Sequence, residues 1–174
     1  MAAMVSAALS GGIGAREMVR VGLETNPFGY GDPMFGGRVM ADRVKAFLQL
    51  ASEAEDDRAL VQALAREVAH LHPYDPIDVL GVPMAAMYAS DGDGARSITI
   101  AANDRYLDER GDLRQLRDVD CTASVAGALV GALRGVEAFR EDWVEAVMTA
   151  NKALYGINIE ANARAFCEAV YSTG

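Results

Sequence analysis

The sequence predicts an all-α protein, a compact multi-helix bundle, and three observations support this fold class. Apolar residues recur with helical spacing along most of the 174 residues, no run shows sustained β alternation, and glycine and proline separate the apolar segments. Hydrophobic residues make up 51% of the chain, which is enough for one sizeable core. We therefore expect residues 1–174 to form a single domain.

Helices and helix breakers alternate in the N-terminal part of the chain. We expect a short apolar helix over residues 2–9, stopped by Gly11 and Gly12, and a second helix over residues 15–23. Residues 26–37 contain two prolines and four glycines, which excludes regular structure and predicts either a functional loop or a plain connector. A helical stripe of apolar residues then covers residues 38–50.

Aspartates mark the starts of the next helices. Asp56 or Asp57 begins a helix that ends at His72 and Pro73. Asp93 belongs to an Asp-Gly-Asp-Gly segment that resembles a calcium loop only faintly, because the glycine and the final glutamate of an EF-hand are missing. A turn followed by a helix N-cap explains this segment better.

Composition and charge exclude several classes of partner. The formal net charge is −9 and no arginine cluster is evident, so nucleic acid is not expected as a partner. Cys121 and Cys167 are far apart and outside any CxxC pattern, which favours a reducing, cytoplasmic location. The apolar start lacks the positive charge of a signal peptide, and the uncharged run at residues 121–133 is too short for a membrane span.

The most informative segment runs from Arg117 to Ala123. Asp118 and Asp120 lie at the start of an apolar helix, with no basic residue downstream until Arg134. Charge beside an apolar core needs a partner, and carboxylates suit a hard cation such as Mg²⁺ or Mn²⁺. A helix N-terminus also suits phosphate. The structural alternative is that Asp-x-Asp only caps the helix and supplies a first-turn acid.

Gly127, Gly131 and Gly135 recur every four residues along this helix, which places them on one face. Glycine inside a helix costs up to about 1 kcal/mol relative to alanine, so we expect another backbone to approach this face closely. The pattern thus predicts a buried central helix that holds its own N-terminus in place. Trp143 is expected in a following amphipathic helix, where packing explains it better than substrate stacking.

This pattern resembles the ADP-ribosylglycohydrolase family. Members carry Gly/Arg-Asp-x-Asp-Thr/Cys-x-Ala-x-x-x-Gly-x-x-x-Gly-Ala in their C-terminal part, and residues 117–132 follow that motif. Residues 135–143 resemble the Gly-x-Glu and Trp that come next in the family, and residues 82–103 resemble the helix pair that precedes the motif. The close resemblance covers roughly residues 82–145.

The resemblance implies both a fold and a chemistry. It implies an all-α ADP-ribosylglycohydrolase bundle and metal-dependent hydrolysis of the bond between ADP-ribose and a protein acceptor. Asp118, Asp120 and Cys121 would be ligands in a two-metal site for Mg²⁺ or Mn²⁺. A thiol is a soft ligand that suits these ions poorly, and Thr122 is the nearest hydroxyl that would replace it.

The chain departs from the family in two ways. The Gly-Asp-Ala/Gly motif and the Thr/Ser-Asp-Asp cluster of the family's N-terminal part are missing, so the chain resembles a C-terminal half, an incomplete bundle without an assignable general base. Residues 104–116 form a polar insertion beside the proposed metal site that would alter or block access to it.

Three hypotheses follow from the resemblance and these departures. The first is the metal-binding half of a glycohydrolase, active with a partner chain or with an N-terminal half. The second is a non-catalytic helical module that binds ADP-ribose or a related nucleotide. The third is a degenerate remnant, which predicts exposed apolar surface and with it a partner chain or a homo-oligomer.

Overall fold

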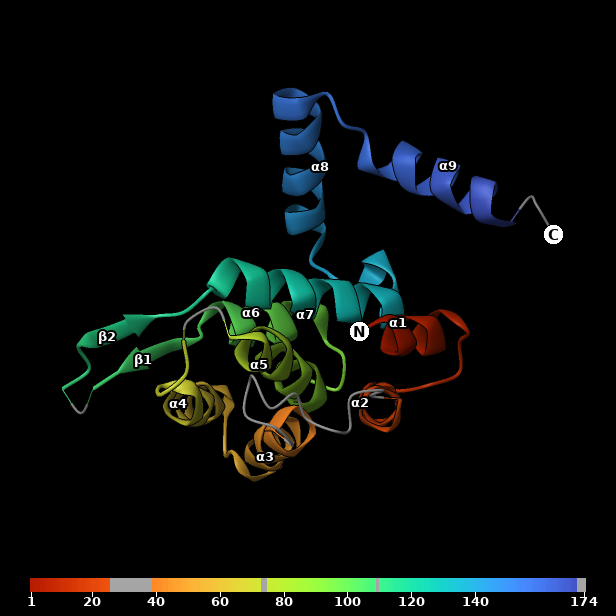
Figure 1. The fold of residues 1–174 in the computed structure, drawn as a ribbon. Helices are drawn as coiled ribbons and strands as arrows, with labels where there is room; N and C mark the ends of the chain where they lie inside the picture. Colours follow the sequence, from red (N-terminus) through yellow and green to blue (C-terminus); the bar gives the residue numbers. More distant parts are fainter. Residues whose placement is uncertain (26–38, 73–74, 109, 172–174) are drawn as a thin grey trace. The chain divides into compact units, whose positions relative to one another are not determined.

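The computed structural model describes residues 1–25, 39–72, 75–108 and 110–171 (Figure 1). These residues are almost entirely helical, so the prediction of an all-α protein is confirmed. The chain forms two compact units, Met1–Ala138 and Phe139–Gly174. The expectation of a single domain over residues 1–174 stays a prediction. None of the helices in the described parts of the chain is long and apolar enough to cross a membrane.

The first unit begins with four helices: α1 (Ala2–Leu9), α2 (Ala15–Glu24), α3 (Val39–Glu53) and α4 (Asp57–Val68). They agree with the predicted helices within a few residues. Gly11 and Gly12 follow the C-terminal end of α1. Their φ angles are 80° and 79°, in the left-handed region that glycine adopts freely. The predicted irregular segment at residues 26–37 lies outside the described residues.

The core of the first unit is built around α5 (Pro76–Ala89), which packs against α3, α6 (Gly94–Ala102) and α7 (Val119–Arg134). Most of α5 is buried. The core gathers large apolar side chains from five helices: Phe47, Leu60, Leu64, Val68, Val82, Ile100 and Leu129. Their burial explains why helices with weak individual stability form here, since tertiary packing supplies most helical stability in proteins.

The central position predicted for α7 is confirmed, because it packs against α1, α5 and α6. The explanation from its glycines is wrong at two positions. A Cβ at Gly127 would lie 3.6 Å from Ile98 Cδ1, so a side chain and not a backbone faces it. Gly135 lies outside the helix, which it ends with φ of 77°. Helical spacing cannot distinguish a glycine that permits close packing from one that ends the helix.

The polar insertion forms a β-hairpin, which the sequence did not predict. Strand β1 (Arg105–Leu107) pairs antiparallel with β2 (Leu113–Leu116). The Asp108 carboxylate closes the turn by accepting the backbone N–H groups of Arg110 at 2.9 Å and Asp112 at 3.0 Å. Strands this short show too few alternations for a periodicity signal.

The last part of the first unit is a 3-10 turn, η2 (Val136–Ala138). The second unit contains α8 (Glu141–Tyr155) and α9 (Ile159–Tyr171). Trp143 lies in α8 as predicted, with the Arg140 guanidinium 5.2 Å from its ring centre. Gly156 ends α8 in the left-handed conformation, at φ of 67°.

The packing of α5 against α3 gives a stability prediction. A Cβ added at Gly81 would lie 2.5 Å from two ring atoms of the fully buried Phe47, so we expect Gly81→Ala to lower the free energy of unfolding by about 1–3 kcal/mol. Gly127→Ala is the matched control, because the added Cβ would meet Ile98 at an ordinary contact distance. This substitution should raise the free energy of unfolding by up to about 1 kcal/mol. Urea unfolding measures both, and equal effects would contradict the expected close contact.

Candidate functional site

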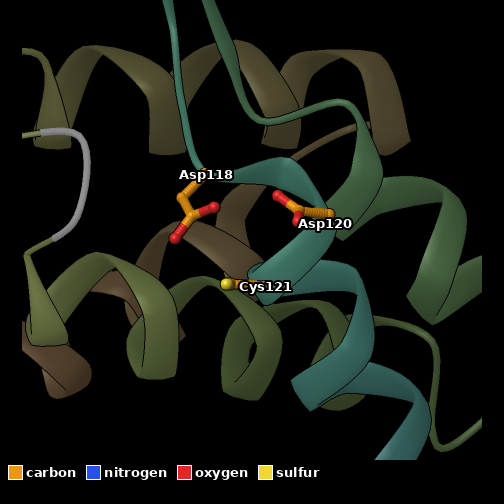
Figure 2. Close-up of side chains that lie close together, drawn as sticks. All are labelled: Asp118, Asp120 and Cys121. Carbon is orange, nitrogen blue, oxygen red and sulfur yellow. The ribbon is translucent and has the colours of Figure 1, made fainter.

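Asp118, Asp120 and Cys121 lie together at the start of α7 (Figure 2). One ligand atom from each residue lies within 4.8 Å of the other two. Asp118 is half-buried, whereas Asp120 and Cys121 are exposed, so solvent reaches these donor atoms. Within the described parts of the chain, no other group of three or more His, Cys, Asp or Glu side chains is arranged to hold a metal ion.

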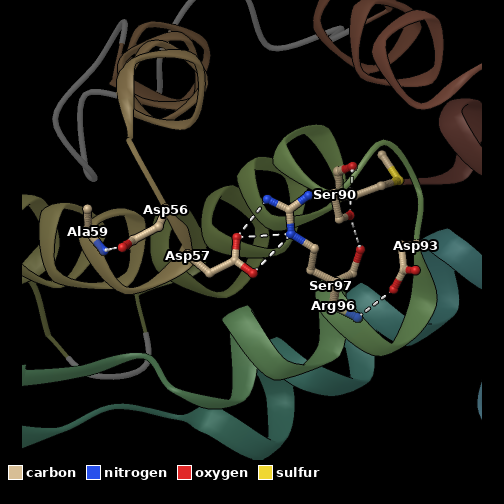
Figure 3. Close-up of polar contacts among 8 residues, drawn as sticks. Asp56, Asp57, Ala59, Ser90, Asp93, Arg96 and Ser97 are labelled. Carbon is tan, nitrogen blue, oxygen red and sulfur yellow. Dashed lines mark hydrogen bonds and ion pairs between the residues drawn. The ribbon is translucent and has the colours of Figure 1, made fainter.

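Asp118 occupies the N-cap position of α7 but does not cap it. Its side chain accepts no backbone N–H, and its ψ is 63°. Three other helices do have aspartate caps, each with an extended backbone: Asp56 accepts from Ala59 N at 2.7 Å, Asp75 from Ile77 N at 2.9 Å, and Asp93 from Arg96 N at 2.7 Å. Figure 3 shows two of these caps. The capping explanation therefore fits Asp56 and Asp93, as predicted, but not Asp118.

The donor set fits a hard cation through its carboxylates. A hydrogen bond to Asp118, some desolvation and the charges of Asp118 and Asp120 all raise the pKa of the exposed Cys121 thiol. A neutral thiol is a weak ligand, so the oxygen atoms of the two aspartates are the donors suited to Mg²⁺ or Mn²⁺. The same two charges that disfavour a thiolate would stabilise a bound cation.

Thr122 does not serve as a substitute ligand. Its side chain is fully buried, and the single proton of its hydroxyl is shared between the carbonyl oxygens of Ala101 at 3.0 Å and Val119 at 3.1 Å. The contact with Ala101 joins α7 to α6, so Thr122 has a packing role. Adjacent positions on a helix lie about 100° apart, so Thr122 points into the protein although Cys121, its neighbour in the sequence, is exposed.

Arg117, immediately before the site, forms a buried ion pair with Asp78 of α5. Both side chains are 0% exposed. Arg117 Nε donates to Asp78 Oδ2 at 2.7 Å, and its two terminal nitrogens donate to the carbonyl oxygens of Leu71 at 3.0 Å and His72 at 3.2 Å. The pair therefore fixes the chain directly before Asp118 against α5.

A second buried carboxylate, Asp104, adjoins this pair. Asp104 is 2% exposed, and neither of its oxygens accepts a hydrogen bond from any described residue, nor does Asp78 Oδ1. Burial and the nearby charge of Asp78 raise the pKa of Asp104 to about 8. Burial also raises the pKa of Asp78, although Arg117 opposes this shift. A pKa of about 8 favours the protonated form of Asp104 at neutral pH, which leaves one negative charge, on Asp78, facing one arginine.

Sequence reasoning missed this buried cluster of Asp78, Asp104 and Arg117. A separation of 39 positions divides Asp78 from Arg117, and no local pattern connects them. Asp78 lies in the first turn of α5, where an acid is ordinarily explained by the helix dipole. Its full burial is the signal that distinguishes it, and burial becomes visible only in the folded chain.

The buried cluster predicts a pH-dependent stability. The pKa of Asp104 is higher in the folded chain than its ordinary value of 3.8, so the folded state binds more protons between about pH 4 and 8 and loses stability as pH rises through that window. Asparagine has nearly the same size as aspartic acid but no titratable proton to lose. We therefore expect Asp104→Asn to gain stability relative to wild type with rising pH, by at most about 1.4 kcal/mol per pH unit.

Urea unfolding at several pH values between about 5 and 8 measures this difference. Asp112→Asn is the control, because Asp112 lies exposed in the hairpin turn, away from the buried cluster. Its stability should follow the wild-type curve. A constant difference between Asp104→Asn and wild type across the window would contradict a protonated Asp104.

Comparison with known proteins identifies a family. A family model described as ADP-ribosylglycohydrolase matches residues 1–172. No curated protein and no solved structure matches the chain. The family match therefore reaches well beyond residues 82–145, over which individual motifs are recognisable, and includes α1 to α4 as well as α8 and α9.

Proposed function

Because the chain belongs to the ADP-ribosylglycohydrolase family, we propose that it is the metal-binding part of a hydrolase that cleaves the bond between ADP-ribose and a protein acceptor. Family membership supports the hydrolase class. The observation that carries the finer proposal is the pair of carboxylates at the start of α7, where Asp118 is positioned to cap the helix and does not. A carboxylate that is not used for capping remains available to a ligand.

We propose that Asp118, Asp120 and Cys121 hold Mg²⁺ or Mn²⁺, with the carboxylates as the principal ligands. When bound, such an ion orients the ribose and lowers the pKa of a bound water. The chain itself contributes fixed positions for the carboxylates, because α7 packs against three helices. In addition, Arg117, the residue before Asp118, is bonded to Asp78 of α5. The exposed side chain of Asp120 keeps this site open to an ADP-ribosyl substrate.

Metal titration of the whole chain tests the proposal. We expect Mn²⁺ to bind to wild type, and both Asp118→Asn and Asp120→Asn to weaken that binding by at least about tenfold, because each removes a charged ligand. Asp112→Asn removes one exposed carboxylate elsewhere and should leave the affinity unchanged. Isothermal titration calorimetry with Mn²⁺, followed by ADP-ribose, measures both steps.

The outcomes of this titration separate the hypotheses. Metal-dependent ADP-ribose binding that is lost in both variants supports the hydrolase site and justifies assays with ADP-ribosylated protein and a complementing N-terminal half. ADP-ribose binding that persists in EDTA favours the non-catalytic nucleotide-binding module instead. Absence of heat with both ligands would refute a ligand site here and leave the family match as ancestry.

We also propose that a partner chain or a second copy of this chain completes the assembly. The support is exposed apolar surface on α8 and α9, where Val147, Leu154 and Phe166 are 52%, 73% and 70% exposed. We expect the chain to self-associate or to bind a complementing half, and Leu154→Ser with Phe166→Ser to weaken that association. Light scattering measures the mass, and a monomer at all concentrations, alone and with the complementing half, would contradict the proposal.

A further inference from the structure

A cavity of about 360 Å³ lies between α4 and the β1–β2 hairpin. Arg58, Gln62 and Arg66 line it from α4, where spacing of four residues places them on one helical face. Arg105 and Arg110 line it from the hairpin. Figure 1 shows this hairpin beside α4. The volume lies within the range of about 300–1,000 Å³ that is typical of small-molecule sites.

The arginines of this cavity differ from all other arginines that the structure describes. Every described arginine outside the cavity has a partner: an acid for Arg20, Arg43, Arg96, Arg114, Arg117, Arg140 and Arg164, a ring for Arg16, and a carbonyl oxygen for Arg134. The four cavity arginines have no side-chain hydrogen bond, ion pair or ring contact with any residue of the described parts. The expectation that the chain has no arginine cluster was therefore wrong.

The cavity has a surplus of positive charge. Among the described residues that line it, the one acid is Asp108, which already accepts Arg114 Nε at 2.7 Å and two backbone N–H groups. Within the described part of the chain, four cations thus line this cavity beside a single carboxylate that is already paired, in a chain whose formal net charge is −9. Like charges held together repel one another, and a bound anion would offset that repulsion.

We propose that this arginine cavity binds the phosphate groups of a small phosphorylated molecule. Guanidinium groups bind phosphate oxygens in pairs of parallel hydrogen bonds, which makes arginine the side chain best suited to this anion. The cavity is separate from the carboxylates of α7, but β2 leads through Arg117 directly to Asp118. The phosphate belongs either to the diphosphate of the substrate at α7 or to an independent phosphate compound.

Titration with inorganic pyrophosphate in EDTA tests the cavity without involving a metal. We expect wild type to bind pyrophosphate, and Arg58→Gln with Arg66→Gln to weaken binding by at least about tenfold. Arg105→Gln with Arg110→Gln should act in the same direction. Arg20→Gln with Arg164→Gln is the matched control, since it removes the same charge from exposed helix positions outside the cavity and should change affinity less than about twofold.

Two further measurements complete the test. Asp118→Asn should leave pyrophosphate affinity unchanged, so failure of the metal site and failure of this cavity give different results. A parallel loss of ADP-ribose affinity in Arg58→Gln with Arg66→Gln assigns the cavity to the substrate's diphosphate, and an unchanged ADP-ribose affinity assigns it to a separate phosphate compound. The proposal is overturned if wild type does not bind pyrophosphate at millimolar concentration, or if the control variant loses as much affinity as the cavity variants.

Discussion

The buried ion pair between Arg117 and Asp78 is the constraint on which the arrangement of the site depends. It joins the segment before α7 to α5, the most extensively buried helix of the first unit. Removing two charges from water costs several kcal/mol for each ion, and such a pair contributes little net stability even when well hydrogen-bonded. Its consequence is positional: Arg117 also donates to the carbonyl oxygens of Leu71 and His72, and these bonds hold the segment before α7 in place.

Opposite charges are separated along the segment between Arg105 and Asp120. The hairpin contributes two arginines to a cavity whose four cations have no partner among the described residues. The start of α7 presents two carboxylates that form no ion pair with any described base. Among the described residues, the opposite charge nearest to each region is already paired: Asp108 with Arg114, and Arg117 with Asp78. A phosphorylated substrate and a divalent cation supply both signs, so one ligand system would satisfy the two regions together.

The sequence predicted what local patterns determine. Apolar spacing located α1 to α4 and α7, and adjacency within one helical turn brought Asp118, Asp120 and Cys121 together. The same reasoning failed where partners are distant. The arginine cavity joins α4 to a hairpin 39 or more residues later, and its strands are too short to show alternation. Thr122 resembled an available hydroxyl because sequence alone does not show which side of a helix is buried.

An uncapped helix start has a cost that the rest of α7 must offset. Replacing a good N-cap costs about 0.5–2 kcal/mol, and this chain gains that contribution at α4, α5 and α6 through aspartates of the same kind. At α7 the aspartate is present, but its backbone is turned away from the extended conformation that capping requires. Burial of Ala126, Leu129 and Val130 against neighbouring helices supplies the stability that the cap does not. Aspartate caps the helix at α4, α5 and α6, whereas Asp118, which lies beside Asp120, does not cap α7. Such a departure from a local preference is expected where a side chain is kept available for binding.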